Sequence, residues 1–316
     1  MAGIDMITLL GPTASGKTSL GAHLAFCLNG EIISADSRQV YRKMNIGTGK
    51  DYEDYIVQGI KIPFHLVDIH DPGYKYNVYE FHKDFLNAYQ EIISRGKLPF
   101  LVGGTGLYIQ AVLDNYQLIH VPVNSSLRKT LEEKSQAELI SLLQSHRFNL
   151  HNTTDLLQRK RTIRAIEIAE YYQHHPDSHL DLPDIHCLTI GIKMDRSVRR
   201  NNITTRLRKR LREGLIEEVS ELLKTVSPED LIFYGLEYKM VTLYLIGELN
   251  YKEMIEKLEI AIHQFAKRQM TWFRRMEKSG FLIHWIDGQL SLEEKLIRIR
   301  EIIGMEDRKL FNQWKK

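Results

Sequence analysis

The sequence is poor in the residues that form crosslinks and metal centres. Its 316 residues include two cysteines, Cys27 and Cys187, which lie far apart in the chain. Two such thiols form neither a disulfide framework nor a ligand spacing, so we interpret both as reduced core thiols. The 13 histidines include no H-E-x-x-H motif, and a neighbouring pair such as His174 and His175 is expected to be solvated. These absences argue against a zinc centre.

Long apolar runs are also lacking. None approaches the length that crosses a lipid bilayer, and residues 1–5 lead directly into an apolar, strand-like run rather than into a signal peptide. We therefore expect a cytoplasmic protein without a membrane partner. Internal repeats and low-complexity tracts are absent. With 43% hydrophobic and 26% charged residues, the composition indicates an ordinary globular protein with room for one large and one smaller domain.

The excess of positive charge is small, a formal +3, but the basic residues are distributed unevenly. Any one of them could equally be a solvated surface residue. Their clustering, however, favours contact with an extended polyanion such as a nucleic acid. The three clusters are Arg159, Lys160, Arg161 and Arg164; Arg196, Arg199, Arg200, Arg206, Arg208, Lys209, Arg210 and Arg212; and Lys267, Arg268, Arg274 and Arg275.

A phosphate-binding motif stands near the start of the chain. The apolar run 6–10 is followed directly by a segment that fits G-x-x-x-x-G-K-[ST], with a helix start after it. Backbone N–H groups of such a loop point at an anion, the helix dipole adds positive potential, and Lys17 supplies a mobile cation. We therefore predict a ligand with a diphosphate or triphosphate group. The predicted phosphate-binding residues are Gly11, Pro12, Thr13, Ala14, Ser15, Gly16, Lys17 and Thr18.

The order of strand-like and helix-like segments predicts the fold. Short apolar runs at 6–10, 31–35, 64–69 and 98–102 alternate with helical stretches at 17–28 and 78–95. This alternation predicts the α/β class, with a doubly wound parallel sheet like that of P-loop NTPases. Strand character returns at 187–193, and helices are expected at about 196–225, 236–247 and 251–278, before a last strand at 281–285.

The same pattern divides the chain into three parts. Residues 1–114 are expected to form the first part of the α/β core. Residues 115–184 are polar and helical in pattern, and we expect a helical insertion domain there. Residues 185–316 are expected to complete the core and to form a helical C-terminal region with long basic helices.

In an open α/β sheet the ligand lies beyond the carboxyl ends of the strands, so the residues that follow each strand are candidates for the site. Asp36 follows the second strand, where its carboxylate is either a base or metal ligand or simply a helix N-cap. Thr105 follows Gly103 and Gly104. It either caps the next helix or donates its hydroxyl to a phosphate oxygen, with the glycines leaving room for a ligand against the backbone.

Taken together, these segments resemble the tRNA dimethylallyltransferases. The resemblance rests on blocks that occur in order over nearly the whole chain, and such a run is far more specific than a phosphate loop alone. The blocks span residues 11–18, 36–41 with 45–48, 65–72, 101–108 and 266–274.

The resemblance implies a reaction and a set of roles. The reaction is transfer of a dimethylallyl group from dimethylallyl diphosphate to the exocyclic N6 of the adenosine 3′ of the anticodon (adenosine-37) in tRNA, with release of diphosphate. The loop would hold the diphosphate with Arg196 as a second clamp, and Mg²⁺ is the implied cofactor, placed with the help of Thr18. Lys17 and Thr105 would assist the departure of diphosphate. Asp36 would act as the general base on the exocyclic amine.

The resemblance also implies contacts with the anticodon stem-loop of a tRNA. The target base has to be swung out of its stack into the protein, and the helical insertion is expected to face the tRNA. No obligate protein partner is expected. The residues that match tRNA-binding positions are Asp36, Ser37, Arg38, Gln39, Thr105, Arg128, Lys160, Arg161, Thr162, Ile163 and Arg164.

The chain departs from the family pattern at two places. The insertion lacks an Asp-Pro-x-x-Ala block, and the family's Gly-Tyr-Lys-Glu turn appears as Leu236-Glu237-Tyr238-Lys239-Met240, without the glycine and the final acid. We expect the second change to affect tRNA contacts and not the diphosphate site.

Three alternative functions stay open on the sequence alone. A P-loop kinase or NTPase would use the same loop for ATP. A prenyltransferase acting on free adenine nucleotides would not need the basic helices. A non-enzymatic RNA-binding module would explain the arginines but leave the phosphate loop without a role.

Overall fold

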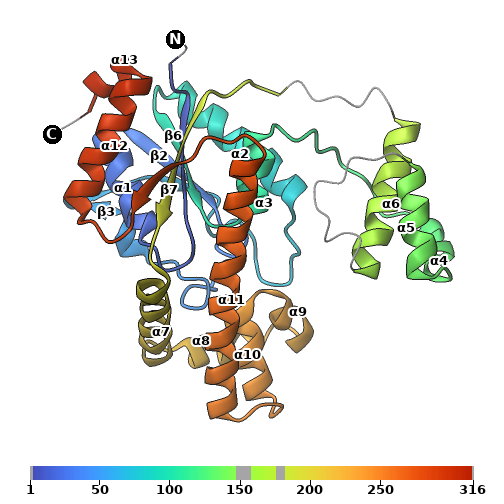
Figure 1. Ribbon diagram of the computed structural model, residues 1–316. Coiled ribbons are helices and arrows are strands. Elements are labelled where there is room, and N and C mark those ends of the chain that lie inside the picture. Colours follow the sequence, from blue (N-terminus) through green and yellow to red (C-terminus); the bar gives the residue numbers. More distant parts are fainter. Residues whose placement is uncertain (1–2, 147–157, 176–181, 315–316) are drawn as a thin grey trace. The chain divides into compact units, whose positions relative to one another are not determined.

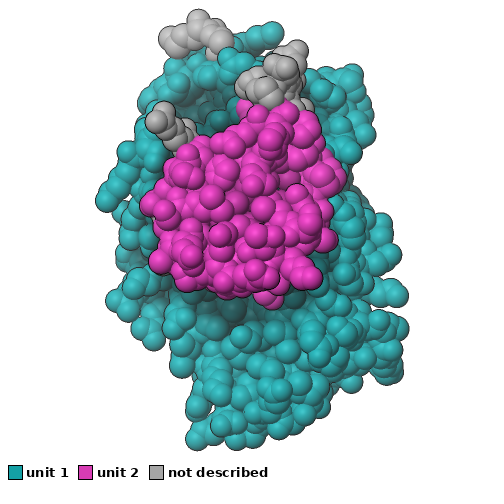
Figure 2. Space-filling view, turned by 90° about the vertical axis from the view of Figure 1, so that its right-hand side faces the viewer, with its two compact units in different colours: residues 1–116, 184–316 teal, residues 117–183 magenta. Residues whose placement is uncertain are grey.

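The computed structural model describes residues 3–146, 158–175 and 182–314 (Figure 1). The chain forms two compact units, which we describe separately. Unit 1 comprises Met1–Tyr116 and Asp184–Lys316, and unit 2 comprises Gln117–Pro183 (Figure 2). Within the described residues, no helix is both long and apolar enough to span a lipid bilayer.

A six-stranded sheet forms the core of unit 1. Its strands follow the order β5-β2-β6-β1-β7-β8, and every neighbouring pair is parallel. The predicted α/β class with a doubly wound parallel sheet is therefore confirmed. The strands are β1 (Met6–Leu10), β2 (Gly30–Ala35), β5 (Phe64–His65), β6 (Leu98–Gly103), β7 (Cys187–Lys193) and β8 (His284–Asp287), and β3 (Ile56–Val57) and β4 (Ile60–Lys61) form a separate antiparallel pair.

Helices cover both faces of this sheet (Figure 1). On one face lie α1 (Lys17–Cys27) and α12 (Leu292–Glu306), and on the other lie α2 (Val78–Ser94), α3 (Gly106–Leu113) and α11 (Tyr251–Lys278). Because both faces are covered, β1 is buried at every position and its sequence is a continuous apolar run. The other elements of unit 1 are the 3-10 helix η1 (Tyr52–Tyr55), α7 (Arg196–Arg212), α8 (Leu215–Leu222), α9 (Pro228–Phe233), α10 (Leu236–Leu245) and α13 (Arg308–Asn312).

Two elements differ from the sequence prediction because of local backbone conformations. β5 ends at His65 rather than at residue 69, since Leu66 and Asp68 have φ angles of 61° and 58°, which an extended strand does not allow. The expected helix 196–225 is divided into α7 and α8 at Gly214, whose φ is 103°. In addition, the last strand begins at residue 284 rather than at 281.

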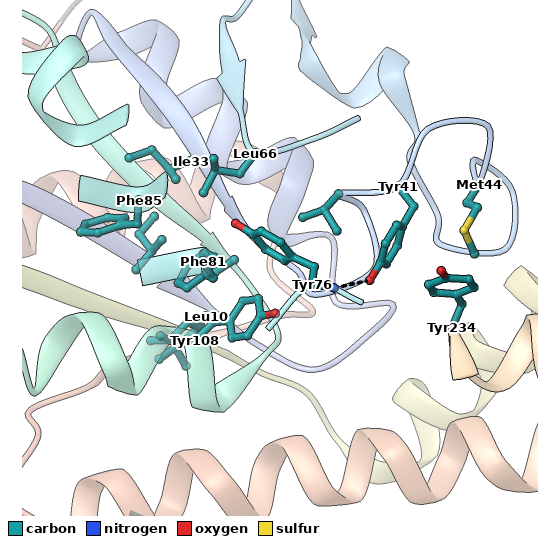
Figure 3. Close-up of a cluster of buried hydrophobic side chains, with 14 of the residues drawn as sticks. Leu10, Ile33, Tyr41, Met44, Leu66, Tyr76, Phe81, Phe85, Tyr108 and Tyr234 are labelled. Atoms are coloured by element: carbon teal, nitrogen blue, oxygen red, sulfur yellow. Dashed lines mark hydrogen bonds between the residues drawn. The ribbon is translucent and has the colours of Figure 1, made fainter. Parts of the chain in front are cut away.

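A cluster of aromatic side chains packs the segment after β2 against the segment after α9 (Figure 3). Tyr41, which follows β2, packs against Tyr234, which follows α9, with ring centroids 4.5 Å apart. The Tyr41 hydroxyl accepts a hydrogen bond of 3.1 Å from the Tyr76 backbone N–H, and the Tyr234 hydroxyl donates one of 2.9 Å to the Tyr74 carbonyl. Because both buried hydroxyls have partners, burial of these rings leaves no polar group unsatisfied.

Unit 2 contains α4 (Ser125–Glu132), α5 (Gln136–Ser145) and α6 (Arg159–His174), which share a small apolar core. Glu167 is buried beside this core. Its carboxylate accepts hydrogen bonds from the guanidinium groups of Arg128 and Arg164 and from the Asn124 backbone N–H. Burial raises the pKa of Glu167, but these hydrogen bonds outweigh burial, and its pKa lies below the usual value.

Candidate active site

A cavity of unit 1 lies at the carboxyl ends of β1, β2 and β6, the edge at which α/β folds bind ligands. Its volume is about 280 Å³. The cavity brings together Lys17, Asp36 and Thr105, the three residues that the sequence predicts as catalytic. Other predicted residues that line it are Thr13, Thr18, Ser37, Arg38 and Gln39.

The phosphate loop has the features of an anion-binding loop. Gly16 is the N-cap of α1, with a φ of 74° that favours glycine. The Ser15 hydroxyl is buried and has no hydrogen-bond partner among the described residues. Burial lowers the pKa of Lys17 to about 8, although the carboxylate of Asp36 opposes the decrease. A bound anion would raise this pKa again, because it favours the charged amine.

Asp36 and Thr105 follow the neighbouring strands β2 and β6. Asp36 Oδ1 accepts the Arg38 backbone N–H at 2.9 Å, and the Thr105 hydroxyl oxygen accepts the Ser37 backbone N–H at 3.1 Å. Neither side chain caps a helix, since a turn follows Asp36 and α3 has no side-chain cap. Within the described part of the chain, Asp36 Oδ2 has no hydrogen-bond partner. This oxygen and the Thr105 hydroxyl hydrogen are therefore available to a ligand.

Gln269 joins three of the sequence blocks, a role that sequence reasoning missed. Its Oε1 accepts the Thr13 backbone N–H at 2.8 Å, and its Nε2 donates to the Gly104 carbonyl at 2.9 Å. The side chain of this α11 residue is buried between the phosphate loop and the turn after β6. The sequence did contain a signal, because residues 266–274 form a block of their own, but it did not say what that block contacts.

The three glycines from the last residue of β6 to the first residue of α3 serve the packing of the chain itself. A Cβ atom on Gly103 would lie 2.3 Å from the Ala35 carbonyl oxygen, and one on Gly104 would lie 2.4 Å from Gln269 Nε2. A Cβ atom on Gly106 would lie 2.4 Å from the Trp272 ring. The sequence analysis expected Gly103 and Gly104 to leave room for a ligand, but neighbouring strand and helix atoms occupy the space beside both.

Gln39 and Arg38 line the cavity in different ways. The Gln39 amide is buried and already bonded at both ends, since Oε1 accepts from the Ser34 hydroxyl at 3.2 Å and Nε2 donates to the Gly49 carbonyl at 3.1 Å. Arg38 is half-buried, and its guanidinium lies 5.3 Å from the centroid of the Phe233 ring. Arg38 therefore has more freedom to contact a ligand than Gln39 has.

The loop after β2 is organised by an acid that sequence reasoning did not single out for the site. The carboxylate of Glu218 on α8 accepts the backbone N–H groups of Asn45, Ile46 and Gly47 at 2.8, 2.7 and 3.0 Å, and it accepts the Tyr238 hydroxyl at 2.7 Å. Such a set of contacts requires the fold to bring two distant segments together, and no local pattern predicts it.

The basic helix α7 contributes two arginines to the cavity, but not the one that the sequence suggested. Arg196 is exposed and is not among the residues that line the cavity. Arg206 and Arg210 do line it. Arg206 pairs with Asp51 at 2.7 Å, and Arg210, which is 9% exposed, pairs with Glu237 at 3.3 Å. Their spacing of one helical turn puts both side chains on the same face of α7.

The predicted tRNA-binding residues of unit 2 differ in their exposure. Lys160 and Arg161 are exposed on α6. Thr162 and Ile163 are buried, because this stretch of α6 faces the core of the unit, so their side chains do not reach a surface where RNA could bind. Arg128 and Arg164 are half-buried through their hydrogen bonds to Glu167 and retain only part of their surface for other contacts.

The cavity offers an oxygen ligand for a magnesium ion that also binds phosphates. In the described residues, no group of three or more His, Cys, Asp or Glu side chains could hold a metal by itself. Mg²⁺ in phosphate sites, however, uses one or two protein oxygens together with phosphate oxygens and water. The Thr18 hydroxyl lines the cavity and is an oxygen of this kind.

Comparisons with known proteins identify the family of this chain. A family model described as IPP transferase matches residues 39–276. A curated protein of Phocaeicola vulgatus, "tRNA dimethylallyltransferase 2", is 57% identical over 300 residues, which cover 95% of this chain and 97% of that protein.

Solved structures extend the similarity to the fold. The crystal structure of a full-length tRNA isopentenylpyrophosphate transferase from Bacillus halodurans is 31% identical, with a TM-score of 0.69, and covers 98% of this chain and 97% of that chain. A eukaryotic dimethylallyltransferase acting on tRNA shares the fold, with a TM-score of 0.72 and 21% identity over 90% of this chain and 74% of that chain. Because the family model matches most of the sequence and the relatives align over nearly its full length, this chain belongs to the IPP transferase family of enzymes.

Proposed function

We propose that this chain is a cytoplasmic tRNA dimethylallyltransferase that transfers the dimethylallyl group of dimethylallyl diphosphate to N6 of adenosine-37, on the 3′ side of the anticodon. The observation that carries this proposal is one cavity lined by Lys17 of a phosphate loop, the carboxylate of Asp36 and the hydroxyl of Thr105. The names of the relatives support tRNA as the acceptor. The alternative function, a P-loop kinase, would not explain the similarity to these relatives.

The diphosphate of the donor binds, in this proposal, to the phosphate loop. Backbone N–H groups of residues 14–18 and the amine of Lys17 contact its oxygens. Arg206 takes the place of Arg196 as a second clamp, because Arg206 lines the cavity and Arg196 does not. As the allylic C–O bond breaks, negative charge grows on the diphosphate, and the Thr105 hydroxyl donates to the bridging oxygen and stabilises that charge.

The acceptor amine requires a base. The lone pair of the adenine N6 is delocalised into the ring, so the amine is a weak nucleophile and has to lose a proton as the new C–N bond forms. Asp36 Oδ2 accepts this proton, while the Arg38 backbone N–H holds Oδ1 at 2.9 Å. The products are N6-dimethylallyl adenosine, diphosphate and a proton on the Asp36 carboxyl. Ser37 and the Arg38 side chain are the proposed contacts to the adenosine and its neighbours, with Gln39 supporting the loop.

Mg²⁺ is the proposed cofactor, with the Thr18 hydroxyl as its protein ligand. When bound, the ion supplies positive charge that stabilises the diphosphate as a leaving group. Thr18 lines the cavity directly after Lys17, so a diphosphate on the loop is within the same site as this hydroxyl.

The proposed RNA contacts of unit 2 follow from exposure. Lys160 and Arg161 present full charges to solvent and suit the phosphate backbone. Arg128 and Arg164 are proposed to contact RNA with the part of each guanidinium that Glu167 leaves free. Thr162 and Ile163 support α6 from the core and are no longer proposed as contacts.

Incubation with labelled dimethylallyl diphosphate, Mg²⁺ and an anticodon stem-loop tests the function. We expect label to enter an RNA with adenosine at position 37 and not an otherwise identical RNA with guanosine there, because guanosine lacks the N6 amine. A parallel reaction with labelled ATP and the same RNA is expected to transfer no phosphate. Transfer of phosphate, or equal labelling of both RNAs, would contradict the proposal.

A further inference from the structure

Arg210 and Glu237 form an ion pair in the wall of the cavity. Arg210 Nη1 lies 3.3 Å from Glu237 Oε1, and both residues line the cavity together with Lys17. The guanidinium also lies directly over Gly49, since a Cβ atom added there would be 1.8 Å from Arg210 Nη2. The Arg210 side chain is therefore fixed between α7, the first turn of α10 and the loop after β2.

This ion pair coincides with a departure from the family pattern. Glu237 stands directly before Tyr238, where the Gly-Tyr-Lys-Glu turn has its glycine. A glycine at this position would offer Arg210 no carboxylate, and any side chain at Gly49 would take the space of the guanidinium. The departure therefore reaches the cavity that the phosphate loop lines, although on the sequence alone we expected it to leave the diphosphate site unchanged.

Positive charge exceeds negative charge in this cavity. The charged residues that line it are the basic Lys17, Arg38, Arg206 and Arg210 and the acidic Asp36 and Glu237. Gathering cations in a buried space costs free energy, and a bound polyanion offsets that cost. Burial is the main cause of the lowered pKa of Lys17, and the Asp36 carboxylate opposes it. The positive charges of Arg206 and Arg210 lower this pKa further, which indicates that their electrostatic potential reaches the phosphate loop.

We propose that Arg210 is a further donor-binding residue that contacts the diphosphate, and that Glu237 is a positioning residue that holds the Arg210 guanidinium toward it. This inference rests on the proposed function, because it takes the diphosphate of the prenyl donor as the ligand. Glu237 engages one end of the guanidinium, and the remaining N–H groups of Arg210 are donors for phosphate oxygens. The guanidinium therefore strengthens diphosphate binding and stabilises the charge that develops as diphosphate leaves.

Titration of the purified protein with inorganic diphosphate and Mg²⁺, followed by calorimetry, tests the role of Arg210 without RNA. We expect Arg210→Met to weaken binding by about ten- to a hundredfold, the usual effect of losing a hydrogen bond to a charged group. Arg210→Lys keeps the charge without the fork and is expected to bind with intermediate affinity. The matched control is Arg212→Met, which removes an exposed arginine of the same helix and is expected to bind like the wild type.

Two substitutions at Glu237 separate positioning from folding. Glu237→Gln retains an oxygen that accepts from Arg210 and is expected to keep diphosphate affinity, whereas Glu237→Met lacks it and is expected to weaken binding. In an Arg210→Met background, Glu237→Met is expected to have no further effect on the dissociation constant. Thermal unfolding of each variant shows whether binding is measured on folded protein.

Several results would overturn the inference. Wild-type affinity in both Arg210→Met and Arg210→Lys would show that the guanidinium does not contact diphosphate. Equal losses in Arg210→Met and Arg212→Met would assign the effect to net charge. Equal effects of the two Glu237 substitutions would remove its positioning role. A wild-type protein that does not bind diphosphate would instead contradict the proposed function, and this inference with it.

Discussion

Thr105 combines an observed structural contact and a proposed chemical role at the same atom. Its hydroxyl oxygen accepts the Ser37 backbone N–H at 3.1 Å, so the loop that contains Asp36 depends on it. The same hydroxyl is the proposed hydrogen-bond donor to the bridging oxygen of the diphosphate. A substitution that removes the hydroxyl therefore affects both roles, and one that keeps it affects neither.

We expect Thr105→Val to lower kcat by about ten- to a hundredfold, because it removes one preorganised donor from the leaving group. Thr105→Ser keeps the hydroxyl and is expected to retain most of the activity. Steady-state kinetics with dimethylallyl diphosphate and an anticodon stem-loop measures the difference. Equal kcat values for Thr105→Val and the wild type would contradict the assigned role.

Glu31 shows how a single buried carboxylate links stability to pH. It is 5% exposed, and it accepts hydrogen bonds from the Arg95 guanidinium and the His65 ring, each at 2.8 Å. Burial raises the pKa of Glu31, but the hydrogen bonds from Arg95 and His65 outweigh burial, and its pKa lies below the usual value. A carboxyl group whose folded-state pKa is depressed stabilises the fold above its unfolded-state pKa, and this contribution is lost as pH falls through the folded-state pKa.

We expect the free energy of unfolding of the wild type to decrease as the pH is lowered past about 4.5, the region in which an unperturbed glutamate titrates. Glu31→Gln is expected to lower stability at pH 7 by about 1–3 kcal/mol and to make its acid dependence shallower. Urea unfolding between neutral and acidic pH measures both effects. Glu256→Gln, at an exposed position, is the control, and identical pH profiles for the two variants would contradict the prediction.

At the scale of elements, α11 connects the parts of the site. This long helix packs on the sheet and carries Gln269 to the phosphate loop and to the turn after β6. The Gln269 amide satisfies the buried Gly104 carbonyl and the partly buried Thr13 backbone N–H, so its loss leaves both without partners. Such unsatisfied groups cost free energy in addition to the lost hydrogen bonds.

We expect Gln269→Leu to destabilise the fold by about 1–3 kcal/mol, because one buried and one partly buried backbone group lose their partners. It is also expected to weaken diphosphate binding, since the phosphate loop loses the contact that anchors Thr13 to α11. Thermal unfolding and diphosphate titration measure the two effects. Gln264→Leu alters an exposed glutamine on the same helix and is expected to change neither. A fold as stable as the wild type in Gln269→Leu would refute the bridging role.

The elements around the site were predictable from the sequence where the residues of the element itself carry the pattern. The run 6–10 predicted β1 because a strand covered on both faces is apolar throughout, and the glycine-rich loop after it predicted the start of α1. Leu66 marks a failure without a signal, because nothing in its side chain predicts the positive φ angle that ends β5. Gly214 marks a missed signal, because a glycine after the basic last turn of α7 is typical of a helix end. Element existence was therefore easier to predict than element boundaries.

The side chains at the site also divide into those whose position the sequence predicts and those whose position depends on the complete fold. Lys17, Asp36 and Thr105 each follow a strand, so their meeting at one edge was predictable from the parallel sheet. Gln269 reaches Thr13 across 256 residues of sequence, and this contact depends on the complete fold. The choice of Arg206 over Arg196 was also beyond the sequence, because both lie on α7 and only the packing of the helix decides which arginines face the cavity.

At the scale of the whole molecule, the cavity and the exposed basic residues Lys160 and Arg161 lie in different units. All of the residues that line the cavity belong to unit 1, whereas Lys160 and Arg161 belong to unit 2. Changes at these two exposed residues are therefore expected to affect RNA affinity without affecting the binding of the donor. This separation gives a test that does not depend on catalysis.

We expect Lys160→Ala/Arg161→Ala to weaken binding of an anticodon stem-loop and to reduce the slope of log affinity against log salt concentration by up to about 0.7–0.9 for each phosphate that the protein no longer neutralises. Diphosphate binding is expected to stay at the wild-type value. The control is Arg308→Ala/Lys309→Ala, which removes two exposed basic residues that are adjacent in sequence on α13. An unchanged slope in the first variant would show that Lys160 and Arg161 are solvated surface residues.

The most direct test of the central claim combines donor binding and transfer in one variant, Asp36→Asn. The account predicts that this variant binds dimethylallyl diphosphate with Mg²⁺ as the wild type does, because the phosphate loop is intact. Its single-turnover rate of transfer to an anticodon stem-loop is expected to fall by about 10²–10⁴-fold, because the general base is lost. A rate close to that of the wild type, or a loss of donor binding as large as the loss of rate, would contradict the account.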